Sequence, residues 1–189
     1  MMAREEQRRS DAERNRRLVI EAGVELLARD PELSMQEVAD ASGLGRSTVY
    51  RHFPNRESLL EAVIAAIVDG AREEIATAVA GGDPEDAVRN LSAASISLAL
   101  RFGHLFAARD GASATYEAFK DDGTSPARRF LEAARERNEI RSDLPVGWLR
   151  SVIQAVTFAA IDEIETGTVD EGTAIRLAGD TVVAILLPA

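Results

Sequence analysis

The sequence contains no cysteine, and this absence excludes several kinds of chemistry. A disulfide framework, a thiolate metal site and a cysteine nucleophile all require thiols. Aromatic residues make up only 5% of the chain, and the two histidines, His52 and His104, lie in different segments. The sequence has no histidine pair with metal-ligand spacing, no glycine-rich phosphate loop and no nucleophile elbow. We therefore expect a protein that is not an enzyme and that uses no cofactor or metal.

Long apolar runs are also missing from the sequence. The longest, around residues 62–68 and 152–161, fall far short of the roughly 20 residues that a membrane span requires. Residues 1–17 are charged and lack the apolar core of a secretory signal peptide. Hydrophobic residues still make up 46% of the chain, which is enough to form a buried core. We expect a soluble, cytoplasmic protein.

The net charge of −10 is divided unevenly along the chain. Residues 1–60 contain 10 arginines and 11 acidic residues, whereas residues 61–189 contain 12 basic and 21 acidic residues. The first part is nearly neutral and includes two basic groups, Arg14, Arg16 and Arg17 in one and Arg46, Arg51 and Arg56 in the other. Because DNA is a polyanion and an acidic surface repels it, we expect this protein to contact DNA only with its N-terminal part.

Apolar residues follow helical periodicity throughout, and no segment alternates with period two over the length of a strand. We predict an all-α fold. The expected helices cover residues 11–29, 34–43, 46–52, 56–80, 84–106, 126–139, 145–165 and 168 onward, and a short helix at 114–119 is left open. The predicted domains are a mobile arm over 1–11, a three-helix DNA-binding domain over 12–57 and an antiparallel helical bundle over 58–189.

Residues 34–53 have the pattern of a helix-turn-helix. Ser34 and Glu37 form a capping-box sequence at the start of the first helix. Gly43 permits the positive φ that a sharp turn requires, and small Ala39 lets the helices approach closely. The apolar residues that would hold the two helices together are Val38, Leu44, Val49 and Phe53.

The outer face of the second helix would then present polar side chains, namely Arg46, Ser47, Thr48, Tyr50, Arg51 and His52. These side chains form the hydrogen bonds that phosphates and base edges require. The alternative is a helical hairpin inside an ordinary bundle, but a hydroxyl-rich, basic outer face in an otherwise acidic chain favours DNA binding.

The segment Thr48-Val49-Tyr50-Arg51-His52-Phe53-Pro54-Asn55-Arg56-Glu57-Ser58-Leu59-Leu60, preceded by this hairpin, resembles the tetracycline-repressor-like (TetR) family. The resemblance covers about residues 12–64. Arg56 replaces the usual lysine, and Gly45 stands where the family often has a serine, so no hydroxyl is present there for a backbone contact.

The resemblance implies roles for several residues. Tyr50, Ser34 and Thr48 would contact the DNA backbone, and Arg56 would hold a phosphate near the start of its helix. Arg46 and Ser47 are the candidates for base edges. His52 would either touch DNA or close the end of the helix. Arg14, Arg16 and Arg17 would either add phosphate contacts or form a solvated face.

The resemblance also implies a homodimer that places two recognition helices on a palindromic operator in double-stranded DNA. Two apolar stripes are the candidate dimer surface, Leu149, Val152, Val156 and Ala160 in one and Ile175, Ala178, Val182 and Ile185 in the other. Both stripes could instead belong to the core of one chain.

A third implication is an apolar small-molecule effector bound between the central helices. The candidate residues are Arg101, Phe102, His104, Phe106, Tyr116, Phe119 and Trp148, although the aromatic residues could equally be core. The predicted function is a DNA-binding transcriptional regulator, a repressor released from its operator by an effector. The alternative is a regulator without an effector that acts through a protein partner.

Overall fold

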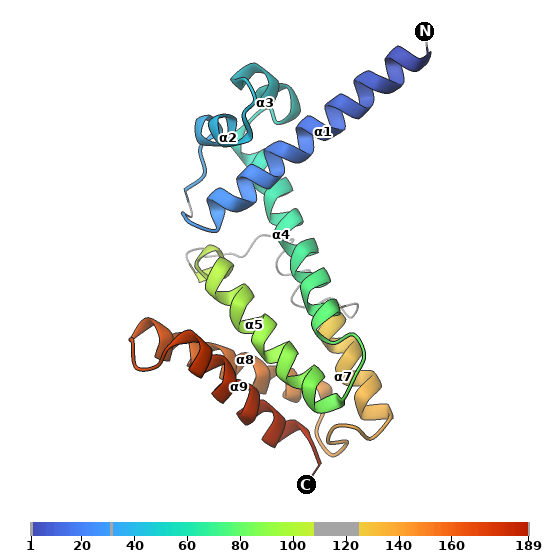
Figure 1. The fold of residues 1–189 in the computed structure, drawn as a ribbon, viewed down its shortest axis with the longest axis vertical. Coiled ribbons are helices and arrows are strands. Elements are labelled where there is room, and N and C mark those ends of the chain that lie inside the picture. Colours follow the sequence, from blue (N-terminus) through green and yellow to red (C-terminus); the bar gives the residue numbers. More distant parts are fainter. Residues whose placement is uncertain (1, 31, 108–124, 189) are drawn as a thin grey trace. The chain divides into compact units, whose positions relative to one another are not determined.

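The computed structural model describes residues 2–30, 32–107 and 125–188, except for the side chains of residues 2–4 and 104–107. Throughout these ranges the regular structure is helical (Figure 1), which confirms the predicted all-α fold. The helices are α1 (Met2–Leu27), α2 (Met35–Ser42), α3 (Arg46–His52), α4 (Arg56–Ala78), α5 (Pro84–Ala107), α7 (Pro126–Glu136), α8 (Val146–Glu165) and α9 (Glu171–Leu186). The short helix considered at 114–119 lies outside the described residues.

The chain forms two compact units that divide within α4, between Asp69 and Gly70. In the first unit, α1, α2, α3 and the beginning of α4 enclose an apolar core that includes Val19, Val38, Val49, Leu59 and Val63, each fully buried. Gly23 on α1 lies directly against Val63 on α4, and a Cβ atom at Gly23 would stand 2.5 Å from a Val63 methyl group. A glycine is therefore needed where these two helices cross.

The helix-turn-helix forms as predicted. Ser34 caps α2, its side chain accepts the Glu37 amide at 3.2 Å, and the Glu37 carboxylate accepts the Ser34 amide at 3.1 Å. Gly43 ends α2 with a φ of 68°, the left-handed conformation expected for the turn. Val38, Ala39, Val49 and Phe53 are buried between the helices. Local sequence signals thus position α3 against α2.

The start of α1 differs from the prediction. The helix begins at Met2 and includes most of the segment expected to be an arm before residue 12. Its residues are mainly glutamate, glutamine and arginine, which have high helix propensity. Gln7 donates a hydrogen bond to the Asp11 carboxylate at 3.2 Å, one helical turn further on. Good helix formers extend a helix that the core has already nucleated.

In the second unit, α5 packs against both α8 and α9, and those two helices also pack against each other (Figure 1). One apolar cluster joins α5, α7, α8 and α9 and includes Leu91, Leu131, Leu149 and Val182. A second, smaller cluster consists mainly of short side chains from α5, α8 and α9: Ile96, Ala160, Ala174 and Ala178.

Four of the eight residues in the two stripes predicted to form the dimer surface are buried in this intramolecular core. Leu149 and Val182 are fully buried within one chain, and Ala160 and Ala178 are buried in the smaller cluster. The partly buried members, Val152, Val156, Ile175 and Ile185, pack against the same clusters. The four buried residues are covered by other helices of the same chain, whereas a contact of the four partly buried ones with a second chain stays a prediction.

Candidate nucleic-acid interface

The outward face of α3 is polar and accessible. Arg46, Ser47, Tyr50 and Arg51 are exposed, and Tyr50 presents 43% of its surface to solvent although it is aromatic. Thr48 is half-buried at the first turn of the helix. Val49 points the other way and is fully buried, which fixes the rotation of α3 about its own axis. The helix therefore presents two guanidinium groups, a phenol and a hydroxyl on one surface.

Two residues predicted to touch the DNA backbone already have partners within the unit. The Ser34 hydroxyl donates to the Glu37 carboxylate and accepts the Glu37 amide, so its single proton is in use. The Arg56 Nε donates to the Leu33 carbonyl at 2.6 Å, which joins the start of α4 to the segment before α2. The two terminal nitrogens of the Arg56 guanidinium remain for a phosphate, whereas Ser34 would first have to release Glu37.

His52 closes the end of α3. Its Nε2 atom is buried and has no hydrogen-bond partner, and the residue as a whole is half-buried. Burial lowers the pKa of the imidazole, and the nearby charges of Arg51 and Arg16 lower the pKa further. The buried Nε2 atom favours the closing of the helix end, and a contact of His52 with DNA stays a prediction.

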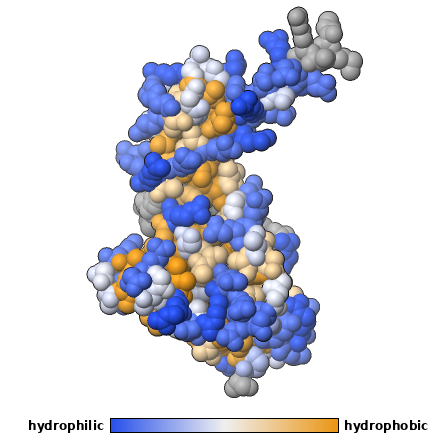
Figure 2. Space-filling model, in the orientation of Figure 1, coloured by the Kyte–Doolittle hydropathy of each residue, from blue (hydrophilic) through white to orange (hydrophobic). Residues whose placement is uncertain are grey.

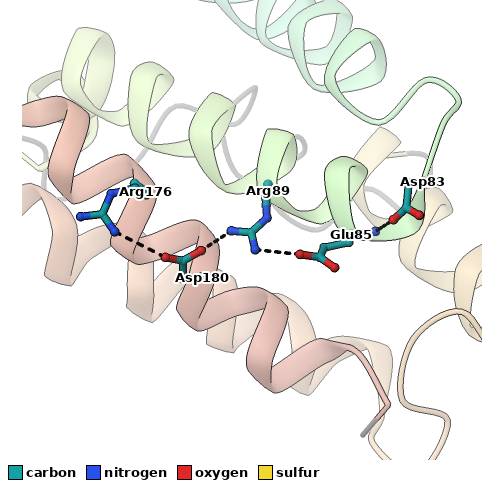
Figure 3. Close-up of polar contacts among 5 residues, drawn as sticks. All are labelled: Asp83, Glu85, Arg89, Arg176 and Asp180. Atoms are coloured by element: carbon teal, nitrogen blue, oxygen red, sulfur yellow. Dashed lines mark hydrogen bonds and ion pairs between the residues drawn. The ribbon is translucent and has the colours of Figure 1, made fainter.

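Arginines are paired very differently in the two units. In the second unit Arg89, for example, bridges Glu85 on its own helix and Asp180 on α9, and Arg176 also approaches Asp180 (Figure 3). Among the described residues of the first unit, none of the arginines forms an ion pair with a carboxylate. These arginines are Arg8, Arg9, Arg14, Arg16, Arg17, Arg29, Arg46, Arg51 and Arg56. Phosphate binding requires positive charge of this kind, which carboxylates of the same chain do not neutralise.

α1 lies next to the recognition helix. The Arg16 guanidinium is 5.3 Å from the ring centroid of Phe53, the residue that directly follows α3. This distance is within the range of a cation–π contact. Arg14 and Arg17 are exposed nearby on the same helix. The basic groups at residues 14–17 and 46–56, which are far apart in sequence, therefore belong to one region of the first unit.

Comparison with known proteins identifies this arrangement. Residues 19–63 match the model of the bacterial regulatory proteins of the tetR family. The chain is 29% identical over 161 residues to the HTH-type transcriptional repressor LfrR of Mycolicibacterium smegmatis, with 82% of each chain covered. It is 33% identical over 72 residues to the HTH-type transcriptional regulator SAR0097 of Staphylococcus aureus, which covers 36% of this chain and 38% of that protein.

The chain belongs to the TetR family of transcriptional regulators. Solved structures agree with this assignment at the level of the fold. LfrR in complex with proflavine matches with a TM-score of 0.65 at 22% identity, covering 93% of this chain and 99% of that one. A TetR regulator from Chloroflexus aurantiacus matches with a TM-score of 0.76 at 18% identity, covering 95% and 100%.

In this TetR-family regulator, the residues predicted to bind an effector are only partly brought together. Phe102 on α5 is buried, and the Arg101 guanidinium lies 4.9 Å from its ring centroid and 3.1 Å from the Glu74 carboxylate on α4. Trp148 on α8 is instead 60% exposed. Tyr116, Phe119 and the side chains of His104 and Phe106 lie outside the described residues. A groove between the α7–α8 connection and the end of α9 includes none of the predicted ligand residues.

The regulator also has an exposed apolar face that the sequence analysis missed. Trp148 and Phe158 on α8 are 60% and 59% exposed, and Leu177 on α9 is 46% exposed. They lie away from the α5-facing residues of the same helices. The available signal was that α8 has large apolar side chains all around its axis, a pattern typical of a helix with partners on two sides.

Proposed function

We propose that this regulator is a homodimeric repressor that binds a palindromic operator through α3 and is released by a small effector bound in the second unit. The observation that supports DNA binding most directly is the outward face of α3, with its exposed Arg46, Tyr50 and Arg51 beside further arginines that have no carboxylate partner. The acidic remainder of the chain would limit contact with DNA to this surface.

Within this proposal Arg46 and Ser47 contact base edges, whereas Tyr50, Thr48 and Arg56 contact phosphates. A guanidinium can bind guanine with two hydrogen bonds and discriminate by about 1–3 kcal/mol against other bases. A phosphate contact has no such sequence preference. Ser34 is the least favoured of the backbone contacts because Glu37 occupies its hydroxyl.

The test begins with selection of binding sites from a pool of random duplexes, from which we expect a palindrome. On the selected site, Arg46→Ala should weaken binding by roughly 5- to 150-fold for each half-site, and on a scrambled duplex by much less. Tyr50→Phe should weaken binding to both duplexes by a similar factor of about 5 for each half-site. Arg129→Ala, an exposed change on α7, serves as the control. Equal losses for Arg46→Ala on both duplexes would contradict base recognition.

The proposed dimer surface is the exposed face of α8 and α9 that includes Trp148, Phe158 and Leu177. Three large apolar side chains that are each about half exposed are unusual on a monomer and typical of an interface. Between them and beside them, α8 and α9 present small exposed residues such as Ala155, Ala159 and Ala184. Small side chains let helices from two chains approach closely.

The proposed effector is a planar aromatic cation. The second unit already holds one planar cation, the Arg101 guanidinium, between the Phe102 ring and the Glu74 carboxylate. A cationic ring could replace it with the same stacking and charge pairing. The relative LfrR has been crystallised with proflavine, a molecule of this class. The effector would bind preferentially to a dimer whose two DNA-binding units do not match the spacing of the operator, and it would thereby lower the population of the dimer that binds DNA.

Thermal unfolding with and without proflavine tests this effector class. We expect stabilisation by proflavine and a smaller effect in Glu74→Gln, whereas a neutral tricyclic of similar size should stabilise less. Absence of stabilisation by any planar cation would favour the alternative regulator, which has no effector and acts through a protein partner.

A further inference from the structure

The part of α1 that precedes Val19 contributes no fully buried side chain to the core, although Arg16 stacks on Phe53. The first buried residue of α1 is Val19, and every described side chain before it is exposed or only partly exposed. Residues 5–18 therefore extend the helix by roughly 20 Å beyond the core. The same stretch is mostly hydrophilic on the face shown in Figure 2, and Ala12 and Leu18 are its only apolar residues.

This extension starts beside the recognition helix. Arg16 stacks on Phe53 at the end of α3, and the helix continues outward from there toward Met2 (Figure 1). Arg9 is seven residues before Arg16, so it lies two turns further along nearly the same face, roughly 10 Å away along the helix axis. Arg8 is adjacent to Arg9. The helix thus continues the basic region of α3 away from the core.

The charge of the extension is positive where it is closest to α3. Residues 8–17 contain five arginines and two acidic residues. Asp11 accepts a hydrogen bond from Gln7, and neither Asp11 nor Glu13 is within ion-pair distance of an arginine in this described stretch. A helix that is polar on all sides has little stability of its own, so a partner that uses its charge would account for its composition.

We propose that this extension is a second DNA-contacting element, in which Arg8 and Arg9 bind phosphates of the duplex that flanks the half-site contacted by α3. The inference rests on the proposed DNA binding by α3. The occupant is DNA because the extension adjoins the α3 surface, its residues 8–17 include five arginines against two acidic residues, and Ala12 and Leu18 are the only apolar side chains among residues 5–18. Arg16 remains against Phe53 and positions the helix, so it does not belong to the pair of phosphate contacts.

The test compares the full chain with R8Q/R9Q on the operator recovered by selection, once with 10 added base pairs on each side and once trimmed flush. The matched control is R128Q/R129Q, which removes two adjacent arginine charges from α7 in the second unit. Affinity is measured between 50 and 200 mM salt. Because arginine and glutamine have similar helix propensities, circular dichroism should report equal helicity for all three proteins.

On the flanked duplex, we expect the slope of log affinity against log salt to decrease by about 3.6 for R8Q/R9Q, since each of the two protomers loses two phosphate contacts and each contact contributes about 0.9. Its deficit relative to the unmodified chain should therefore shrink by roughly 150-fold across this salt range. On the trimmed duplex the two proteins should have equal slopes, and R128Q/R129Q should match the unmodified chain on both.

Three results would overturn the inference while leaving DNA binding by α3 intact. They are an unchanged slope for R8Q/R9Q, an equal decrease on the flanked and trimmed duplexes, and an equal decrease for R128Q/R129Q. If the unmodified chain selects no duplex at all, the proposed function fails and this inference fails with it.

Discussion

At the scale of single residues, His52 has two predicted roles, and its burial favours one of them. The sequence gives a histidine near the end of a DNA-binding helix, where it could contact phosphate or fill space. In the structure its Nε2 atom is buried without a partner, and the positive charges of Arg51 and Arg16 lower the pKa of the ring. A protonated imidazole there would have a charge without a counter-charge, so the neutral form is favoured.

This environment predicts a loss of stability in mild acid. The pKa of His52 is lowered in the folded chain relative to its ordinary value of 6.5, so below that pH the unfolded state binds more protons and stability falls as pH falls. Three carboxyl groups also have lowered pKa values, those of Glu139, Asp143 and Asp170. Their contribution to folding stability is lost only below about pH 4.5, where these groups begin to be protonated in the unfolded chain.

The measurement is the free energy of unfolding by urea at pH 7.5, 6.5 and 5.5. We expect a decline for the unmodified chain and a smaller decline for His52→Gln, which cannot be protonated. If the two proteins decline in parallel, His52 is not the group responsible. The difference should be absent between pH 7.5 and 8.5, where the imidazole is neutral in both states.

At the scale of elements, the segments with local signals were predicted most closely. The bounds of α2 and α3 follow from Ser34, Gly43 and Pro54, each of which acts on its nearest neighbours. The start of α1 was not predicted because its residues are good helix formers without apolar periodicity. Sequence alone does not distinguish such a segment from a disordered arm, since the outcome depends on a helix that begins elsewhere.

The turn between α2 and α3 contains two glycines, and only one of them needs to be a glycine. Gly43 has a φ of 68°, whereas Gly45 has a φ of −63° and open space around its Cα. Gly43→Ala should therefore destabilise the chain by roughly 1–2 kcal/mol, because a Cβ atom is strained in the left-handed region. Gly45→Ala should change stability by less than about 1 kcal/mol, because Gly45 is the N-cap of α3, where alanine is unfavourable, and this loss offsets the lower flexibility of the unfolded chain.

Urea unfolding of the two variants side by side tests this difference. Gly43→Asn should recover part of the loss, because asparagine tolerates the left-handed conformation better than alanine. Similar stabilities for Gly43→Ala and Gly45→Ala would mean that the turn relaxes to another conformation.

At the scale of the whole molecule, the dimer surface was harder to predict than the DNA-binding surface. Periodicity identifies an apolar stripe but not the partner that covers it, and α8 has apolar residues on two sides. The stripe chosen from sequence, with Leu149 and Val156, faces α5. The opposite face, with Trp148 and Phe158, became apparent only when the packing of α5 against α8 and α9 was known.

The exposed face of α8 and α9 therefore gives the last prediction. Each aromatic side chain that a second chain covers should contribute about 1.5–3 kcal/mol to association. Phe158→Glu would replace that gain with a buried carboxylate, so we expect the dimer to weaken by at least 100-fold. Asn90→Glu, an exposed change on α5 that introduces the same charge, should leave association unchanged.

Sedimentation equilibrium distinguishes the outcomes, because the chain mass is 20.4 kDa and a dimer has twice that mass. The unmodified chain and Asn90→Glu should sediment as dimers at micromolar concentration, and Phe158→Glu as a monomer with unchanged helicity. The monomer should also lose most of its affinity for a palindrome while it still binds a single half-site weakly, since α3 belongs to the other unit. A monomeric unmodified chain, or a dimer that survives Phe158→Glu, would exclude this face as the interface.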